Sequence, residues 1–403
     1  MRTLVFAAIL ILAACSGHNN GNTTPRSGPP VMQDAPNTGF QPAFPGQTRA
    51  PEVRSNIAIA VEEIATALNH PWAVEVLPDG AMLVTERAGR LRVITRDGRV
   101  SEHVAGLPAV EAEGQGGLLD VAVSPNFARD QLIYWTFSEP RDGGNGTSVA
   151  RGRLNREANR VEDVAVIFRQ LPAWRSRGHF GSRIVFDRDG RLFIALGDRQ
   201  QRESRELAQD LSTHIGKVVR INSDGSPAPG NPFAGRADAR AENWSYGHRN
   251  IQGAALHPET GELWIIEHGP QGGDELNIAR AGLNYGWPVI SYGEEYNGSP
   301  VNDGIAVREG MEQPIYYWDP VIAPGGMLFY RGDLFPWRGN LLIAGLRTQA
   351  VVRLELDGER VVGEDWLVHG EVGRIRDIAE AADGSLLVVT DEDEGRLLRL
   401  TPG

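Results

Sequence analysis

The feature that most constrains the fold is a unit that recurs six times between residue 57 and the C-terminus. Each copy has an apolar run, a turn rich in Pro, Asp, Asn or Gly, and a second apolar run, which is the pattern of a β-hairpin. The paired runs cover residues 72–77 and 81–85, 119–123 and 132–135, 182–186 and 192–196, 254–258 and 263–266, 327–330 and 340–344, and 375–379 and 386–390. Six copies give roughly 58 residues per unit, the length of a propeller blade with long loops.

The repeat predicts an all-β fold, a six-bladed β-propeller whose blades are four-stranded antiparallel sheets. One such sheet cannot bury both of its faces alone, whereas six sheets packed radially bury them against one another. The 48 glycines and 25 prolines fall mainly at turns, which agrees with many short strands. Only residues 206–211 have helical spacing, and we expect a short helical excursion there. A pair of β-sandwiches is the alternative, although it does not need so even a repeat.

The N-terminus has the features of an export signal. After Arg2, residues 4–12 form an apolar run too short to span about 30 Å of hydrocarbon as a helix, and small residues then lead to Cys15. This ending resembles a bacterial lipobox, in which the cysteine becomes the lipidated first residue of the mature protein. We predict a lipoprotein signal peptide over residues 1–15 and a periplasmic protein whose only membrane contact is a lipid anchor at Cys15. Ser16 suggests sorting to the outer membrane, and a plain signal or an uncleaved anchor is the alternative.

Composition sets the other boundaries. Residues 16–54 are rich in Asn, Gly, Pro, Ser and Thr and predict a flexible linker, which leaves residues 55–403 as the catalytic propeller domain. Cys15 is the only cysteine, so no internal disulfide can form, which is compatible with an oxidising compartment. The net charge of −12, from 40 Lys and Arg against 52 Asp and Glu, argues against nucleic acid as a partner.

Five polar clusters lie where turns interrupt the strands, which is where a propeller carries its chemistry. The first is a Gly-rich loop at residues 113–120 with Gln115 at its centre, and a plain turn has the same composition. The second places His179 in residues 177–183, with Asp198 at the far end of the same hairpin. An imidazole can accept a proton near neutral pH, and a carboxylate on its other nitrogen would fix the tautomer. The alternative is a histidine that is hydrogen-bonded within its loop.

The third cluster places Arg249 and Asn250 ahead of an apolar strand. A guanidinium is a fixed cation and a forked donor, suited to an anion or a developing oxyanion, although a surface ion pair is an equal alternative. The fourth cluster, residues 267–277 followed by 284–288, combines carboxylates with a loop rich in Gly and Pro. Such a loop can turn several carbonyls toward a hard cation such as calcium, but its spacing is not that of an EF-hand.

The fifth cluster has Arg374 and Arg376 at alternate positions of one predicted strand, which puts both guanidinium groups on one face. Like charges side by side are unfavourable unless an anion lies between them. The pair therefore favours a bound polycarboxylate or phosphate over a solvated face. Arg347 follows a strand of the fifth repeat and is placed to join them.

These motifs together, and their order, resemble a known family. The segments that carry the resemblance are residues 178–179, 247–250, 269–270, 274–275, 284–288 and 374–377. The chain is similar to the soluble dehydrogenases of sugars that depend on pyrroloquinoline quinone (PQQ), and more to the compact aldose sugar dehydrogenases of bacteria than to the longer glucose dehydrogenases. The resemblance begins near residue 58 and implies a six-bladed propeller. It also implies oxidation of the anomeric carbon of an aldose sugar to a lactone, by hydride transfer to calcium-bound PQQ.

The resemblance further implies roles for single residues. His179 would be the general base, Asp198 would orient it, and Arg249 would polarise the quinone oxygen. The cofactor would be bound by Gln115, Arg249, Asn250, Arg347, Arg374 and Arg376. Calcium would be held as a Lewis acid by the carbonyls of Gly269 and Pro270, with Glu275 and Tyr285 assigned to calcium at a neighbouring site. The electron acceptor and the preferred sugar are not indicated.

Two positions depart from the sequence pattern of the glucose dehydrogenases. Those enzymes have Asp before the base, where this chain has Gly178. They have Lys where Arg347 aligns, and arginine keeps the positive charge but changes the reach of the side chain.

Two other functions stay open. A calcium-dependent lactonase or esterase on a similar propeller would use a metal-bound water and would not need the arginine cluster. A non-catalytic binding propeller would give no reason for five motifs in this order.

Overall fold

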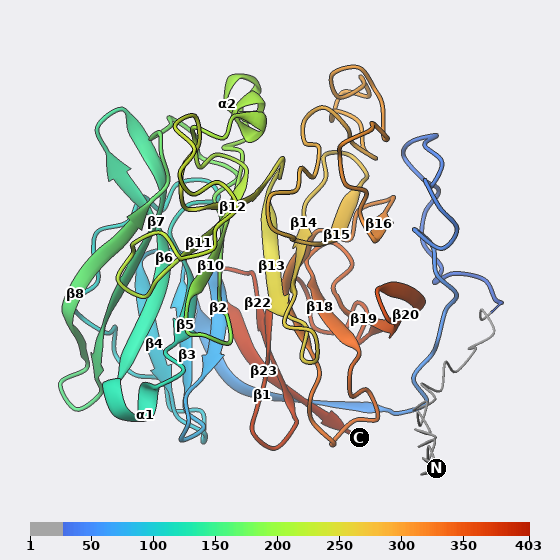
Figure 1. Ribbon diagram of the computed structural model, residues 1–403. Coiled ribbons are helices and arrows are strands. Elements are labelled where there is room, and N and C mark those ends of the chain that lie inside the picture. Colours follow the sequence, from blue (N-terminus) through green and yellow to red (C-terminus); the bar gives the residue numbers. More distant parts are fainter. Residues whose placement is uncertain (1–26) are drawn as a thin grey trace, which may run out of the picture.

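The computed structural model describes residues 27–403, which form a six-bladed β-propeller (Figure 1). The innermost strands β2, β5, β9, β13, β17 and β21 each contact the next, and β21 contacts β2, so the ring is closed. The predicted fold class is confirmed, and each of the six predicted hairpins supplies the two innermost strands of one blade.

Five blades have four antiparallel strands, and the blade formed by β2 to β4 has three. The fourth position of that blade is reduced to a single bridge between Ile94 and Val100. In chain order the blades are β2 (Pro71–Val76), β3 (Met82–Glu86), β4 (Arg90–Ile94); β5 (Leu118–Val123), β6 (Leu132–Arg141), β7 (Gly144–Asn155), β8 (Arg160–Arg169); β9 (Gly181–Phe186), β10 (Leu192–Leu196), β11 (Lys217–Ile221), β12 (Asn243–Tyr246); β13 (Ile251–Leu256), β14 (Leu263–Glu267), β15 (Asp274–Ile278), β16 (Tyr316–Trp318); β17 (Pro324–Phe329), β18 (Leu341–Gly345), β19 (Ala350–Asp357), β20 (Arg360–Leu367); and β21 (Ile375–Glu380), β22 (Leu386–Thr390), β23 (Gly395–Pro402), with β1 (Ile59–Leu68) as the outer strand.

The last blade is completed by the start of the propeller chain. Strand β1 pairs antiparallel with β23, from Ile59 opposite Pro402 to Leu68 opposite Gly395 (Figure 1). Main-chain hydrogen bonds therefore join the two ends of the chain in one sheet. A ring of blades closed in this way has no free radial edge between its first and last blades.

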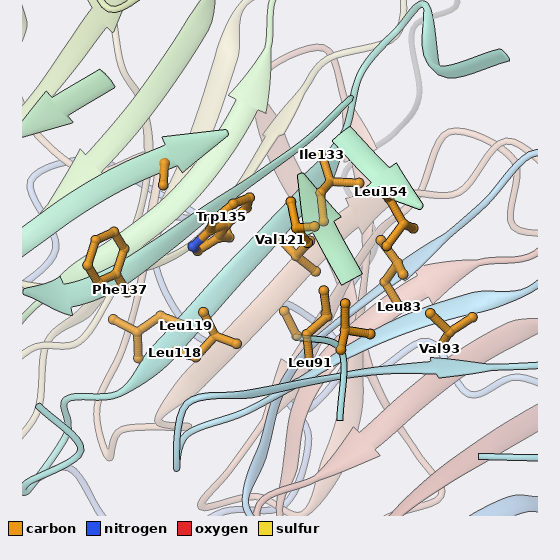
Figure 2. Close-up of a cluster of buried hydrophobic side chains, with 14 of the residues drawn as sticks. Leu83, Leu91, Val93, Leu118, Leu119, Val121, Ile133, Trp135, Phe137 and Leu154 are labelled. Carbon is orange, nitrogen blue, oxygen red and sulfur yellow. The ribbon is translucent and has the colours of Figure 1, made fainter. Parts of the chain in front are cut away.

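The core consists of separate layers between neighbouring blades. Figure 2 shows one layer, in which Leu83 and Leu91 of the first blade pack with Trp135 and Phe137 of the second. Alternation within a strand serves two layers at once, because successive side chains point to opposite faces. In β18, Leu341 faces the blade before it, whereas the next side chain along the strand packs in the layer with the blade after it.

Helices are few and short. Helix α1 covers Phe127–Asp130, α2 covers Arg202–Glu206, and a 3₁₀ turn, η1, follows at Leu207–Gln209. A helical excursion was expected at residues 206–211. The observed one begins earlier, at Arg202, and ends earlier, at Gln209. Within residues 27–403 no helix is long and apolar enough to cross a membrane.

The segment before β1 differs from the flexible linker expected over residues 16–54. In its described part, from residue 27, the chain lies along the outer edges of β16 and β20 (Figure 1). Asn37 and Thr38 both bond to the carboxylate of Asp319, and the side chain of Gln47 is fully buried. The polar side chains of this segment form specific hydrogen bonds with the propeller, so its polar composition does not make it a flexible linker. The predicted signal peptide and Cys15 lie outside the described residues.

Candidate active site

The candidate site is a cavity of about 260 Å³ at one end of the propeller channel. All six inner strands run in the same direction, so their N-terminal ends meet at this end, and each blade contributes to the wall. Four of the six predicted cofactor-binding residues line this cavity, and they come from three blades: Gln115, Asn250, Arg374 and Arg376. The wall is formed by Trp72, Arg87, Gln115, Leu119, Phe180, Gly181, Ser182, Asn250, Gln252, His268, Ala323, Leu346, Arg374, Arg376 and Asp391.

His179 adjoins this cavity and is paired with Asp198 as predicted. Its Nδ1 lies 2.6 Å from Asp198 Oδ1, and its main-chain N–H donates to Gln115 Oε1 over 2.8 Å. Trp287 Nε1 donates to the other oxygen of Asp198 over 2.7 Å, which fixes the carboxylate. A carboxylate at Nδ1 places the proton on that nitrogen and leaves the Nε2 lone pair free to accept one.

Burial and charge set the protonation states of this pair. Burial lowers the pKa of His179, and this outweighs the opposing effect of Asp198. Burial alone would raise the pKa of Asp198, but His179 and Arg249 bring it below its usual value. His179 is therefore a neutral imidazole at neutral pH beside an ionised carboxylate, which is the state that a general base needs.

Arg249 lies beside the pair and is held by the loop that follows β14. Its Nη1 donates to the carbonyl oxygens of His268, over 2.8 Å, and Gly269, over 2.7 Å. Its carbonyl accepts a hydrogen bond from the N–H of Asp198 over 2.8 Å. Asn250 turns its Oδ1 toward the N–H of Gly181 at 3.2 Å, so it also borders the loop that carries the histidine. The structure thus brings Arg249 and Asn250 to the same site as His179.

The predicted arginine pair faces the cavity, with a carboxylate of the protein between the two guanidinium groups. Arg376 Nη2 bonds to Asp391 Oδ2, and Arg374 Nη2 lies 3.9 Å from the same oxygen. His70 Nδ1 lies 2.9 Å from the other oxygen of Asp391. Burial would raise the pKa of Asp391, but Arg376 and His70 hold it well below its usual range. The anion expected between the arginines is therefore supplied in part by the protein itself.

Arg87 also lines the cavity, and sequence reasoning missed it. It follows β3 directly, and the C-terminal end of β3 lies at the same end of the blade as the start of β2. Its place directly after β3 is the sequence feature from which a role at this end of the propeller could have been predicted. Arg347, in contrast, is exposed and lies one residue beyond Leu346, which is part of the wall. Its predicted contact with a cofactor stays a prediction.

The four residues predicted to hold calcium border one small cavity behind Arg249. Gly269, Pro270, Glu275 and Tyr285 all line it. Burial and the nearby carboxylate of Glu267 raise the pKa of Glu275 well above its ordinary value. The hydroxyl of Tyr285 is engaged with the main chain, since it accepts from Arg280 N over 2.8 Å and donates to a carbonyl.

The donor types around this small cavity suit a hard cation. Among the described residues no group of three or more His, Cys, Asp or Glu side chains is arranged to hold a metal. A cation here would rely on main-chain carbonyls together with a carboxylate, which is a donor set that calcium accepts. It would also offset the repulsion between Glu267 and Glu275.

Residues 68–399 match the family described as Glucose / Sorbosone dehydrogenase. The chain belongs to this family. Aldose sugar dehydrogenase YliI of Escherichia coli (strain K12) is 43% identical over 348 residues, which are 85% of this chain and 93% of the relative. Quinoprotein glucose dehydrogenase B of Acinetobacter calcoaceticus is 28% identical over 415 residues, covering 83% of this chain and 85% of the relative.

Solved structures of the glucose/sorbosone dehydrogenase family give the same result. The apo-form of the soluble aldose sugar dehydrogenase from Escherichia coli has a TM-score of 0.82 and 42% identity, covering 86% of this chain and all (100%) of the other. The PQQ-bound aldose sugar dehydrogenase from Streptomyces coelicolor has a TM-score of 0.70 and 29% identity, covering 85% and 99%. The predicted family and the prediction of an enzyme of the dehydrogenase type are confirmed. These relatives favour a dehydrogenase over the lactonase and the binding module.

Proposed function

We propose that this member of the family oxidises the anomeric carbon of aldose sugars to lactones with PQQ and calcium. The observation that carries the proposal is a buried, neutral His179, oriented by Asp198, beside a cavity with three guanidinium groups. The base accounts for proton removal from a hydroxyl, and the guanidinium groups account for an anionic cofactor. The relative solved in its PQQ-bound form and the relative named a quinoprotein support this choice of cofactor.

The cavity fits a polycarboxylate in charge and in hydrogen-bonding capacity. Arg87, Arg374 and Arg376 face it, against the single carboxylate of Asp391. Arg87 and Arg376 each keep a buried Nε that has no hydrogen-bond partner among the described residues. A buried donor without a partner costs free energy, so a ligand that accepts a hydrogen bond from it gains binding free energy. PQQ has three carboxylates, and these arginines would hold it with Gln115 and Asn250.

Bound PQQ would supply the two-electron acceptor, and calcium held by the carbonyls of Gly269 and Pro270 would supply the Lewis acid. The protein would supply the proton acceptor, because His179 Nε2 is free to take the proton of the anomeric hydroxyl. The C–H bond of the anomeric carbon and its O–H bond both break, and the carbon becomes the carbonyl of a lactone. Asp198 would stabilise the imidazolium that forms.

Arg249 would add electrostatic stabilisation at this step. Its Nη1 is used by two carbonyls, but its buried Nε has no hydrogen-bond partner among the described residues. A guanidinium held in a fixed position stabilises negative charge that develops beside it, at no cost of reorganisation. Trp287, whose ring lies 5.2 Å from the Arg249 guanidinium carbon, would keep the group in place and exclude water.

The test is reconstitution of protein purified in the presence of a chelator. With aldose sugars and an artificial electron acceptor, we expect turnover only after PQQ and calcium are both added. The same rate without PQQ would remove the dehydrogenase proposal. His179→Ala should abolish turnover while its melting temperature stays close to that of the unmodified protein, and a variant within twofold of the unmodified rate would mean another base.

We also propose that the protein is exported to the periplasm and anchored by lipid at Cys15. The support is the signal over residues 1–15, all of them outside the described part of the chain. Cys15→Ser should move the protein from the membrane fraction to the soluble fraction of a cell that processes lipoproteins. The same distribution in both forms would contradict the anchor.

A further inference from the structure

The proposed base has a backbone conformation that few residues with a side chain adopt. The φ of His179 is 48°, in the left-handed region. The turn that follows Asp198 is similar, with Arg199 at 66° and Gln200 at 69°. Such strain persists only where the surroundings impose it. The contacts that hold these two segments therefore decide where the imidazole lies.

Arg199 holds the base loop, residues 176–180, on both sides of His179. Its side chain is fully buried, and its Nη2 donates to the carbonyl of Ser176 over 2.9 Å. Its guanidinium carbon lies 3.6 Å from the centre of the ring of Phe180, the residue after the base. Its main-chain N–H donates to the carbonyl of His179 itself over 3.3 Å. One residue therefore contacts the loop before, at and after the base.

The positive charge of Arg199 forms no ion pair within residues 27–403. Its guanidinium donates to neutral oxygens, which are the carbonyls of Ser176 and His179 and the side-chain oxygen of Asn145. The carboxylate of Glu111 bonds to the amide of Asn145 instead, over 2.7 Å. Burial lowers the pKa of Arg199 to about 9, so the group remains a cation at neutral pH. A buried charge without an ion pair costs folding free energy, so stability alone does not account for a cation here.

Charged and titratable groups from several elements surround the imidazole of His179. Asp198 faces its Nδ1, the cations of Arg249 and Arg199 act on it, and His268 lies near it. Burial lowers the pKa of His179, Asp198 opposes this effect, and both arginines lower the pKa further. His268 is a neutral imidazole, because burial lowers its pKa to about 3. Arg199 is thus the cation that belongs to the same hairpin as the base.

We infer that Arg199 is a positioning residue for the base: its guanidinium fixes the loop that carries His179, and its unpaired charge keeps the imidazole free of a proton before the sugar binds. The inference rests on the proposed function, in which His179 takes the proton of the anomeric hydroxyl. A base must lie within hydrogen-bond reach of that hydroxyl, and a displacement of about 1 Å can cost about 100-fold in rate. Asp198 fixes the tautomer of the ring, whereas Arg199 fixes the main chain that carries the ring.

The test compares two substitutions in holoenzyme saturated with PQQ and calcium. Arg199→Lys keeps the charge but loses the forked donor and the flat group that lies over Phe180. We expect kcat to fall about 10-fold, with KM for the sugar within about threefold and the pH midpoint of activity unchanged. Arg199→Met also removes the charge. Its kcat should fall about 10- to 100-fold, and the midpoint on the acid side should rise by about 0.5 to 1 pH unit.

Arg353→Lys is the matched control for the loss of a buried arginine. Arg353 is also buried, donates to the carbonyl of Val53 and has its guanidinium carbon 5.6 Å from the centre of the Trp337 ring. It belongs to β19 in the fifth blade and, unlike Arg199, pairs with Asp365. Its replacement should lower the melting temperature and leave kcat and the pH midpoint unchanged.

A second measurement does not depend on turnover. In apo-protein with isotope-labelled histidine, the ring signals of His179 can be assigned by their absence in His179→Ala. They should titrate at a higher pH in Arg199→Met than in the unmodified protein, and at an unchanged pH in Arg199→Lys.

An unchanged kcat in Arg199→Lys would overturn the inference, and this result decides the matter if Arg199→Met does not fold. An unchanged titration of His179 in a folded Arg199→Met would also overturn it. So would a lower melting temperature as the sole effect of both substitutions. Failure of the proposed function is a separate result, because the unmodified protein would then oxidise no sugar in the presence of PQQ and calcium.

Discussion

Asp198→Asn is the most direct test of the catalytic pair, because it removes one charge and keeps the shape of the side chain. The buried carboxylate accepts hydrogen bonds from His179 Nδ1 at 2.6 Å and from Trp287 Nε1 and the N–H of Gln200, each at 2.7 Å. Oδ2 accepts the bond from Trp287, whereas Oδ1 accepts those from His179 and Gln200, so the single oxygen of asparagine cannot keep all three. With that oxygen on Trp287, the amino group faces Nδ1, which favours the tautomer with the proton on Nε2 and leaves no free lone pair toward the substrate.

The size of the loss follows from the charge that the imidazole acquires. An imidazolium and a carboxylate whose charge centres lie about 4 Å apart attract by about 4 kcal/mol at an effective dielectric constant of about 20. At 1.36 kcal/mol per factor of ten, this is about a 1,000-fold loss of rate. The tautomer change increases it, and the same substitution in a Ser-His-Asp triad costs about 10,000-fold. We therefore expect kcat to fall about 1,000- to 10,000-fold, with little change in KM.

The assay is steady-state turnover from pH 5 to pH 9 with saturating PQQ, calcium and sugar, with the melting temperature as a check on folding. Because burial lowers the pKa of His179 below that of a free imidazole, the unmodified enzyme should keep more than half of its activity at pH 6.5 and lose the rest at lower pH. Trp287→Phe is the control: it removes one donor and keeps the charge, so it should cost at most about tenfold. A loss below tenfold in Asp198→Asn at every pH would refute the pairing.

Three further predictions follow from other parts of the structure. Arg376→Ala should weaken PQQ binding to the apo-protein about 10- to 100-fold in an absorbance titration. Burial raises the pKa of Glu75 to about 8 from 4.5, so the folded state holds this proton longer than the unfolded state and stability falls as pH rises between those values. Denaturant titration should show Glu75→Gln removing on the order of 1–3 kcal/mol of that fall by pH 8. Thr38→Val deletes one of the hydrogen bonds to Asp319 and should lower the free energy of unfolding by about 1–3 kcal/mol, and no change would mean that the N-terminal segment does not stabilise the propeller.

Local patterns were sufficient to predict most of the fold. Each hairpin is set by two apolar runs and the turn between them, and these interactions are close in sequence. Pairing of β1 with β23 joins residues more than 300 positions apart, and no local pattern specifies it. The segment before β1 was predicted to be flexible from its composition. Its order depends instead on distant partners such as Asp319, which composition does not reveal.

The site could be predicted where a motif carries its own chemistry, as with His179 and Asp198. It could not be predicted where the function of a side chain depends on a neighbour from another blade. Arg87 lies on a common type of strand end, and only the folded ring shows that it faces Arg376.

Closure of the ring and assembly of the arginine cavity are the same structural event. Arg87 belongs to the first blade, whereas Arg376 and Asp391 belong to the last, so the charges of the cavity come from opposite ends of the chain. His70, just before β2, contacts Asp391 and donates its N–H to the carbonyl of Glu392 over 2.9 Å, which ties the two blades at the cavity wall. An anion held by arginines of the first and last blades would link these two blades. The pairing of β1 with β23 links the same two blades, so both connections are lost when the ring opens. A ligand that binds only the closed ring stabilises it by mass action, so binding at this cavity and closure by β1 support each other.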